Sequence, residues 1–261
     1  MSRTDSMSIK VGTSGYSFAD WVGPFYPACV AKGKMLDFYV QHFSTVEINS
    51  TYYRIPHPAV MRNIERKTPD GFEFIVKAHR SFTHDRAGLD QSTPEFLASV
   101  TPMAETGKLK GLLAQFPSSF RFNDANLDYV TSGAALFAPI PLFVEYRHDS
   151  WLDPSVKTAM QQAGIGYCNV DEPRLAHLLP SESAATTDVA YVRLHGRNGS
   201  HWWSGGPLRY DYSYSDQELQ EWAERMDLLR EKASKIYVFF NNCHLGQAVK
   251  DAQRFLQMMA R

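Results

Sequence analysis

Hydrogen-bonding and charged side chains stand at the ends of seven short apolar runs in this sequence. Where a run carries two of them, they are two positions apart, so on an extended strand they point to the same face. The set is Glu47, Asn49, Lys77, His79, Gln115, Glu145, Arg147, Asn169, Asp171, Arg193, His195 and Asn241. Carboxylates and imidazoles transfer protons, while guanidinium and ammonium groups bind anions. The pattern therefore predicts a polar site at one end of a parallel sheet.

Cationic and amide side chains in this set predict that the site binds phosphate or carboxylate. Arginine recognises both anions with two parallel hydrogen bonds, and the loops after the last two strands of a parallel barrel commonly hold phosphate. The expected binding residues are Lys77, His79, Gln115, Arg147, Arg193, Arg197, Asn241 and Asn242. The helix that starts near Gly246 adds free backbone N–H groups. The alternative is a structural network of ion pairs that closes the barrel.

Four residues are expected to transfer protons at this site. Glu47, Glu145 and Asp171 would act with His195, which is two residues from Arg193 and is the strongest acid–base candidate. Glu47 and Glu145 would alternatively form the carboxylate pair of a sugar-active enzyme. That chemistry depends on the separation of the two carboxylates, which the sequence does not give.

The same strand ends also carry the ligand types of a divalent metal site. Glu47, His79, Glu145, Asp171 and His195 come from five different strands, which is how barrels assemble metal ligands. The Lys and Arg side chains of the same ring disfavour a metal ion, because they pair with the carboxylates instead. We expect no resident cofactor, and a divalent metal is the open alternative.

Two long connections bring aromatic side chains to the same end of the strands. Residues 14–32 and 196–215 each follow a strand and are rich in Trp and Tyr. Long structured loops at this end usually bind a ligand or cover it. We expect Tyr16 and Trp21 to contact substrate, and the alternative is a small aromatic core that caps the barrel.

Short apolar strands alternate with helical segments along the whole chain, which is typical of parallel βαβ units. Thr93 followed by Pro94 predicts the start of one helix. The glycines at 12 and 15 lack the GxGxxG spacing of a dinucleotide-binding turn, which argues against an open doubly wound sheet. The expected strands are residues 9–13, 45–49, 72–78, 111–115, 142–145, 166–170, 189–194 and 236–240. We predict an α/β fold, a (β/α)8 TIM barrel with irregular helices on one or two returns.

The bulk composition fits one such barrel. The chain has 261 residues, and a barrel needs about 250, so we expect a flexible tail at 1–8 and a single domain at 9–261. A net charge of -1 gives no reason to expect indiscriminate nucleic-acid binding. Three cysteines without metal-type spacing indicate reduced thiols. No secretory signal or membrane span is visible, so we expect a soluble cytoplasmic protein, and no protein partner is indicated.

Several segments together resemble the domain of unknown function 72 family, also called YecE-like. They are Val-Gly-Thr-Ser-Gly-Tyr at 11–16, Glu-Ile-Asn-Ser-Thr-Tyr-Tyr at 47–53, Gln-Phe-Pro at 115–117, Glu-Tyr-Arg-His at 145–148, Val-Arg-Leu-His-Gly-Arg at 192–197 and Phe-Asn-Asn at 240–242. The resemblance covers almost the whole chain and implies a TIM barrel without an established reaction. The family is similar in architecture to endonuclease-four-like and xylose-isomerase-like barrels, from which nucleic-acid binding or hydrolysis has been suggested. Cys243 departs from the family pattern, which usually has His directly after the Asn pair.

Three functional hypotheses follow from these residues. The leading one is a hydrolase that acts on a phosphoester or nucleotide-like substrate bound at the barrel mouth. The second is a non-catalytic protein that binds single-stranded nucleic acid through its loop aromatics. The third is a sugar-active enzyme that uses paired carboxylates. The expected partner is accordingly a small anionic substrate or a nucleic acid, and no membrane.

Overall fold

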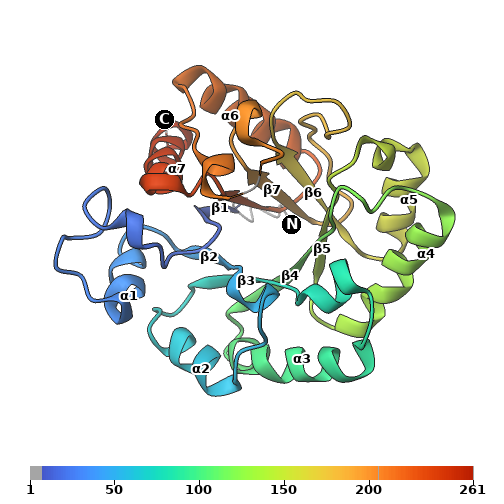
Figure 1. The fold of residues 1–261 in the computed structure, drawn as a ribbon, viewed down its shortest axis with the longest axis horizontal. Coiled ribbons are helices and arrows are strands. Elements are labelled where there is room, and N and C mark those ends of the chain that lie inside the picture. Colours follow the sequence, from blue (N-terminus) through green and yellow to red (C-terminus); the bar gives the residue numbers. More distant parts are fainter. Residues whose placement is uncertain (1–7, 205, 261) are drawn as a thin grey trace, which may run out of the picture.

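Eight parallel strands form the centre of this protein. The structure, a computed structural model, describes residues 8–204 and 206–260. The strands are hydrogen-bonded in the order β1-β8-β7-β6-β5-β4-β3-β2, and they curve into a nearly closed barrel (Figure 1). They are β1 (Ser8–Thr13), β2 (Thr45–Ile48), β3 (Glu73–Lys77), β4 (Leu109–Gln115), β5 (Leu142–Glu145), β6 (Gly166–Asp171), β7 (Val189–Leu194) and β8 (Lys235–Phe240). The predicted TIM barrel is confirmed.

Helices surround the barrel, as Figure 1 shows. They are α1 (Met35–Tyr39), α2 (Pro58–Arg66), α3 (Leu89–Glu105), α4 (Asp124–Gly133), α5 (Pro154–Gln162), α6 (Asp216–Arg230) and α7 (Gln247–Met259). Side chains cap several starts: Asp153 accepts from the Ser155 N–H, and Ser215 forms a reciprocal capping box with Glu218. The connection from β6 to β7, residues 172–188, is fully described and contains no α-helix, which matches the expected irregular return. None of the helices in the described ranges is long and apolar enough to cross a membrane.

The structure differs from the sequence prediction at the start of one helix and at the start of the first strand. The helix expected to begin at Thr93 begins at Leu89 instead, because Gly88 in a left-handed conformation starts it earlier and Pro94 lies inside it. Of the tail expected at 1–8, Ser8 opens β1, and residues 1–7 lie outside the described part of the chain.

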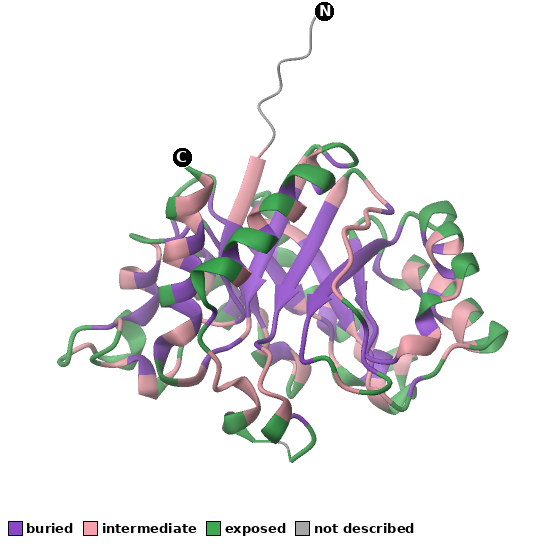
Figure 2. Cartoon of the chain, turned by 90° about the horizontal axis from the view of Figure 1, so that it is seen from above, coloured by how far each residue is buried: buried purple, intermediate pink, exposed green. Residues whose placement is uncertain are grey.

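The barrel interior is filled by side chains that alternate along each strand. Phe143 on β5 points inward between two glycines on the neighbouring strands, Gly111 and Gly166. A Cβ atom at either glycine would lie about 2.5 Å or less from the Phe143 ring, so only glycine leaves room for it. Tyr191 stacks on the same ring at 4.7 Å between centroids. Figure 2 shows the result: the strands are buried, and exposed residues lie mainly on the outer helices and loops.

The barrel closes between β1 and β2 with less backbone pairing than elsewhere. Among the described residues, a single bridge, Ser14 with Glu47, joins this edge. The hydroxyl of Tyr39 on α1 replaces further backbone bonds, because it accepts from the Thr13 N–H at 3.0 Å and donates to the Thr45 carbonyl at 3.1 Å. We call this edge the β1–β2 seam.

Candidate functional site

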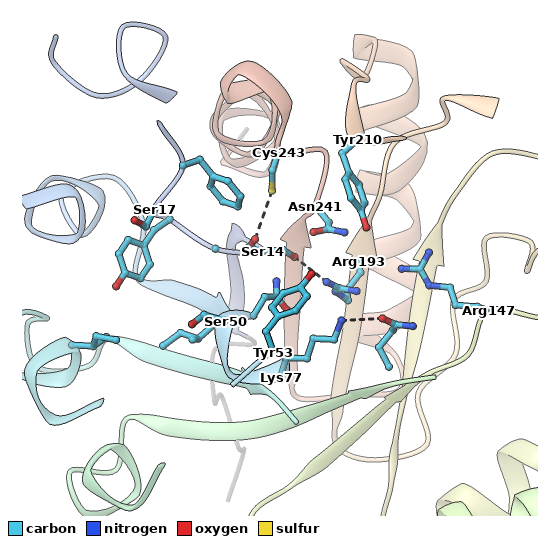
Figure 3. Close-up of a pocket in the computed structure, with 17 residues that line it drawn as sticks. Ser14, Ser17, Ser50, Tyr53, Lys77, Arg147, Arg193, Tyr210, Asn241 and Cys243 are labelled. Atoms are coloured by element: carbon cyan, nitrogen blue, oxygen red, sulfur yellow. Dashed lines mark hydrogen bonds between the residues drawn. The ribbon is translucent and has the colours of Figure 1, made fainter. Parts of the chain in front are cut away.

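A cavity of about 400 Å³ opens at the carboxyl-terminal end of the barrel strands. Its wall includes polar side chains from the ends of several strands, and Figure 3 shows how they converge. Those that matter most for its chemistry are Ser14, Asn49, Lys77, Arg147, Arg193 and Asn241. This is the end at which parallel barrels carry their reactive groups. We call this space the mouth cavity.

Arg193 lies at the centre of a buried ionic network behind the mouth cavity. Its Nη1 donates to Glu145 Oε2 at 2.6 Å, and its Nη2 donates to Glu47 Oε1 at 2.8 Å. Tyr191 Oη donates to the other Glu47 oxygen at 2.6 Å. Burial disfavours the charged guanidinium, but Glu145 and Glu47 outweigh burial, and the pKa of Arg193 lies well above its usual value. Arg193 is therefore a permanent cation that two carboxylates neutralise.

Arg147 extends this network from Glu145 to Glu172. Its Nε donates to Glu145 Oε1 at 2.5 Å, and its Nη1 donates to Glu172 Oε2 at 3.2 Å. Burial favours the neutral form of Glu145, but Arg147 and Arg193 hold the pKa of this carboxyl well below its usual value. Burial raises the pKa of Glu172 to about 7, and Arg147 offsets only part of this effect. Glu145 is thus a permanent anion, whereas Glu172 titrates near neutrality.

His195 is completely buried beside this network and does not line the cavity. Asn241 Nδ2 lies 2.8 Å from its Nδ1, and its Nε2 lies 3.3 Å from Glu145 Oε1. Its Nε2 also lies 3.2 Å from Nη2 of Arg147, so protein groups contact both ring nitrogens. Burial and, after it, the charge of Arg147 hold the pKa of His195 well below its usual value. The neutral ring therefore orients Glu145 and Asn241.

Lys77 differs from the two arginines because it has no carboxylate partner. Its Nζ donates to Gln115 Oε1 at 2.9 Å and lies 4.5 Å from the centre of the Tyr52 ring. Within the part of the chain that the structure describes, no carboxylate oxygen lies within ion-pairing distance of it. Burial lowers the pKa of Lys77 to about 7, with Arg193 adding to the effect. Near neutral pH this amine exists in both protonation states.

Two further polar atoms of the cavity wall have no hydrogen-bond partner among the described residues. They are Nε of Arg193, a donor, and Oδ1 of Asn49, an acceptor. The amide of Asn49 is fixed in this orientation because its Nδ2 donates to Glu47 Oε1 at 2.9 Å. A buried polar atom without a partner costs free energy, so each atom gains a partner if a shift of the wall brings a ligand within reach.

The structure brings most of the residues expected from the sequence together at the mouth. Glu47, Glu145 and His195 lie behind the cavity wall, each in contact with an arginine or an amide of the network. The expected residues that line the cavity are Tyr16, Lys77, Gln115, Arg147, Arg193 and Asn241. Whether any of these residues is catalytic or binds substrate stays a prediction.

Asp171 and Arg197 lie away from the cavity, in contact with each other. Arg197 Nε and Nη2 donate to the Asp171 carboxylate at 2.9 and 3.0 Å, and Tyr214 Oη donates to it at 2.7 Å. The sequence pattern placed Asp171 in the mouth, but β6 has the opposite alternation. Cys168 faces Glu145, and Glu172 reaches Arg147. Glu172 was missed because it lies one residue beyond the end of β6, directly after Asp171.

Three other expected binding residues also lie elsewhere. β3 ends at Lys77, so the strand alternation does not extend to His79, whose Nδ1 contacts Ser81 Oγ at 3.0 Å. Asn242 donates to Asp251 and to the Tyr212 carbonyl. Trp21 is fully buried and donates to the Cys243 carbonyl at 2.6 Å, as the alternative of an aromatic cap expects.

Several residues of the cavity wall were missed by sequence reasoning. They are Ser14, Ser50, Tyr53, Tyr210 and Cys243. Serines and tyrosines in loops carry no spacing signal, so only the folded chain identifies them. Burial raises the pKa of Cys243 above its usual value, so its thiol is not an activated nucleophile.

The loop after β7 covers one side of the mouth. Trp202 on this loop is buried, and its ring centre lies 4.0 Å from the guanidinium carbon of Arg209 and 5.7 Å from that of Arg147. Tyr210 of the same loop lines the cavity. This loop therefore shields the ionic network from water.

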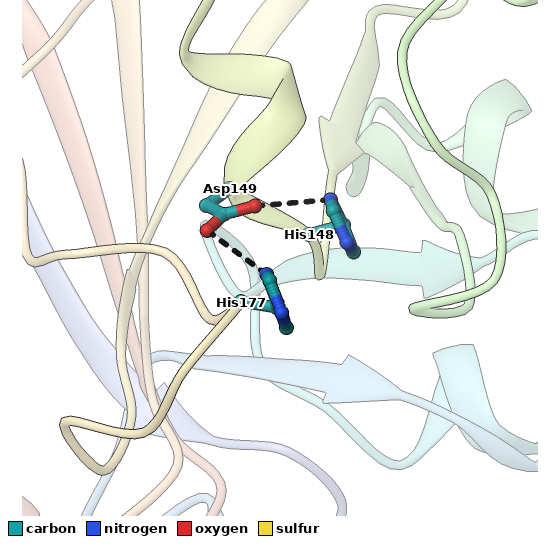
Figure 4. Close-up of side chains that lie close together, drawn as sticks. All are labelled: His148, Asp149 and His177. Carbon is teal, nitrogen blue, oxygen red and sulfur yellow. Dashed lines mark ion pairs between the residues drawn. The ribbon is translucent and has the colours of Figure 1, made fainter.

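A second cluster of metal-ligand types lies outside the mouth cavity. His148, Asp149 and His177 face one another, with the two imidazole Nδ1 atoms 3.2 and 3.4 Å from the Asp149 oxygens (Figure 4). The Nδ1 atom of His148 already accepts from the Ser150 N–H at 3.0 Å and contacts Ser150 Oγ. Because its lone pair is engaged in capping the loop, this cluster is not an open metal site.

Comparison with known proteins identifies relatives along nearly the whole chain. The family described as "Protein of unknown function DUF72" matches residues 10–261. The UPF0759 protein YunF of Bacillus subtilis (strain 168) is 32% identical over 272 residues, covering 96% of this chain and 94% of YunF.

Solved structures agree with the family match. A DUF72 family protein from Thermotoga maritima MSB8 is similar with a TM-score of 0.90 and 38% identity, over 97% of this chain and 99% of that chain. A DUF72 family protein from Enterococcus faecalis V583 has a TM-score of 0.86 and 24% identity, over 97% and 96% of the two chains. The second likeness shows the fold alone.

Proposed function

The chain belongs to the DUF72 family, and we propose that in this member the mouth cavity is the active site of an enzyme for a small anionic substrate. The observation that carries the proposal is Lys77, an amine on the cavity wall without a carboxylate partner among the described residues. A lysine whose pKa is about 7 accepts and donates protons at neutral pH. Lys77 is therefore the proposed proton-transfer group.

The charges around the cavity support an anionic substrate. Arg193 and Arg147 are already paired with Glu47, Glu145 and Glu172. An anion entering the cavity would pair with the ammonium of Lys77, and a small shift of the wall would bring it to the buried Nε–H of Arg193. Phosphate and carboxylate groups both fit this pair of donors.

The rim of the cavity supports a planar group on the same substrate. Tyr53 lines the cavity and is 76% exposed, so one face of its ring is open to a ligand. Stacking on an exposed tyrosine is a common mode of binding for bases and other rings. A nucleotide-like phosphoester combines an anion with such a ring, and a cavity of about 400 Å³ suits a small molecule better than a nucleic-acid strand.

Hydrolysis by Glu145 and His195, as expected from the sequence, has less support than chemistry at Lys77. The Glu145 oxygens are held by Arg193 and Arg147. His195 is completely buried behind them. Neither group reaches a ligand without a rearrangement of the network, whereas Lys77 faces the cavity directly.

Titration of the lysine side chains by NMR tests this proposal. In protein labelled with ¹³C at lysine Cε, we expect one signal to titrate near pH 7, far below the ~10.4 of an ordinary lysine. The signal should vanish in K77M and persist in K10M, a lysine of β1 outside the cavity. Inorganic phosphate should raise this pKa, because it binds the protonated amine. If every lysine titrates in the ordinary range, or if phosphate shifts nothing, the proposal is wrong.

A further inference from the structure

We propose that Lys77 forms an imine with the carbonyl carbon of a hydroxylated anionic substrate, such as a hydroxy-ketone or hydroxy-aldehyde phosphate. This inference rests on the proposed anion-binding active site, and it names a carbonyl compound as the substrate in place of a nucleotide-like ring. Lysine amines form such covalent intermediates when they are neutral and desolvated. Three features of the cavity wall support it.

The first feature is the environment of the amine. Lys77 Nζ is held by one neutral acceptor, Gln115 Oε1, whose own amide donates to the Phe116 carbonyl at 2.6 Å. Gln115 is therefore fixed with its oxygen toward the amine. A lysine that only balanced charge would be expected beside a carboxylate, as Lys235 is beside Glu73 at the other end of the barrel. Lys77 keeps its lone pair for a ligand whenever it is neutral.

The second feature is the pair of unpartnered polar atoms. Oδ1 of Asn49 needs a donor, which a substrate hydroxyl supplies, whereas a carbonyl or phosphate oxygen does not. Nε of Arg193 needs an acceptor, which a carbonyl or anionic oxygen supplies. Figure 3 shows Lys77 and Arg193 pointing into the same space. A substrate with a hydroxyl and a polarised oxygen supplies both missing partners once a shift of the wall exposes the two buried atoms.

The third feature is the state of the other nucleophiles. The thiol of Cys243 also lines the cavity, but it contacts the Ser14 carbonyl at 3.6 Å and burial disfavours its thiolate. Three serine hydroxyls also line the wall, those of Ser14, Ser17 and Ser50. Ser14 Oγ accepts from Nη2 of Arg193 at 3.4 Å and Ser17 Oγ contacts Met35 Sδ at 3.8 Å, and among the described residues none of the three is bonded to an imidazole or a carboxylate. Lys77 is the activated nucleophile among the described residues of the wall.

The covalent step is balanced without any further reactant. The Lys77 lone pair attacks the carbonyl carbon, and the carbonyl oxygen takes up protons and leaves as water. A C=N bond replaces the C=O bond, so amine and carbonyl compound give imine and water. The protonated imine then withdraws electrons from the neighbouring carbon, which favours loss of a proton or cleavage of a C–C bond there.

Trapping with borohydride tests the inference on the full chain. The probe is dihydroxyacetone phosphate, and sodium borohydride reduces the imine to a stable secondary amine that peptide mass analysis locates. We expect modification of Lys77 at least tenfold above any other lysine, loss of this product in K77M, its retention in K10M, and competition by inorganic phosphate. Label spread evenly over surface lysines would overturn the inference.

A second comparison separates hydroxyl recognition from general reactivity. In N49L the rate of trapping with dihydroxyacetone phosphate should fall about tenfold, since a hydroxyl bound in a buried site loses its acceptor. Trapping with hydroxyacetone phosphate, which lacks the free hydroxyl, should change much less. If the trapping rate falls equally with both probes, Asn49 does not bind the substrate hydroxyl.

Failure of the imine is distinguishable from failure of the proposed function. If Lys77 is not trapped but still titrates near pH 7 and responds to phosphate, the anion-binding proton-transfer site stands and the imine is wrong. If Lys77 titrates as an ordinary lysine, both fail.

Discussion

The two ends of the barrel use the same arrangement of side chains for different purposes. At the amino-terminal end, Glu73 on β3 accepts from Lys235 Nζ at 2.6 Å and from Tyr237 Oη at 2.7 Å, both on β8. At the mouth, Glu47 on β2 accepts from an arginine and a tyrosine of β7. In each case a carboxylate spans the interior to a cation and a tyrosine that are two residues apart on one strand.

The difference lies in what surrounds each group. Lys235 is 24% exposed and Glu73 10%, so water screens this pair. Arg193 is 2% exposed and Glu47 is fully buried, so their charges are compensated only by protein. The amino-terminal group closes the barrel, whereas the mouth group also borders a cavity with Lys77 and two unpartnered atoms beside it. The same arrangement thus serves closure at one end and supports a site at the other.

Removing the arginine of the mouth should have the largest effect on stability. R193M leaves Glu47 and Glu145 buried without their shared cation, so we expect the free energy of unfolding to fall by about 3–5 kcal/mol. Urea denaturation followed by circular dichroism measures this loss. A loss below about 1 kcal/mol would mean that water or another cation reaches the two carboxylates, and the contrast between the two ends would disappear.

Removing Lys77 should stabilise the protein, whereas removing Arg193 should destabilise it. The pKa of Lys77 in the folded protein, about 7, lies below its unfolded value, so below pH 7 the folded protein carries the cost of a partly desolvated charge. K77M removes this cost and should stabilise the protein by about 2 kcal/mol at pH 6. The gain should shrink as pH rises toward 10, where wild-type Lys77 is neutral in both states. Denaturation of both proteins at pH 6 and 9 tests this, and a gain that grows with pH would contradict it.

Replacing Glu172 should stabilise the protein less than K77M does, and this gain should grow as pH rises. Its pKa of about 7 in the folded protein lies above the unfolded value, so the wild type is penalised increasingly as pH rises from about 4 through 7. E172Q should match the wild type near pH 4 and be more stable by about 1 kcal/mol at pH 8. Thermal denaturation at both pH values measures the difference. If E172Q is less stable than the wild type by the same amount at both pH values, the ion pair with Arg147 outweighs the cost of burying Glu172.

The smallest effect is expected at the amino-terminal end. K235M removes a partly exposed cation from Glu73, and Tyr237 still donates to this carboxylate. We expect a loss of about 0.5 kcal/mol, which should diminish in high salt. If K235M loses as much unfolding free energy as R193M, the amino-terminal end excludes water as fully as the mouth does.

The fold was predictable from the sequence because two periodic signals agree along the chain. Alternation within strands placed Glu47, Glu145 and Arg193 inward, and the repeat of strand and helix predicted the barrel. Alternation failed on β6, where Asn169 and Asp171 face away from the mouth. Their partners, the Ala184 carbonyl and Arg197, come from the following loops, and no pattern within the strand announces them.

The chemistry of the site was less predictable than its location. In the sequence pattern, three cations stand at strand ends and nothing distinguishes their chemistry: Lys77, Arg147 and Arg193. Only the packed structure distinguishes them, since two meet carboxylates and the third meets an amide. The pKa of a buried amine depends on these neighbours in three dimensions, so sequence spacing cannot supply it.

The β1–β2 seam has a consequence for the way the molecule exchanges its amide hydrogens. β1 is paired with β8 along six residues, but it reaches β2 through one bridge and the hydroxyl of Tyr39. Parts of a protein held by few hydrogen bonds open first. Deuterium should therefore enter at Thr13, whose N–H is bonded only to that hydroxyl, well before the amides between β1 and β8. Replacing Tyr39 by phenylalanine should speed exchange at Thr13 and leave exchange of the amides between β1 and β8 unchanged. Exchange at this single amide therefore reports local opening of the seam next to the cavity.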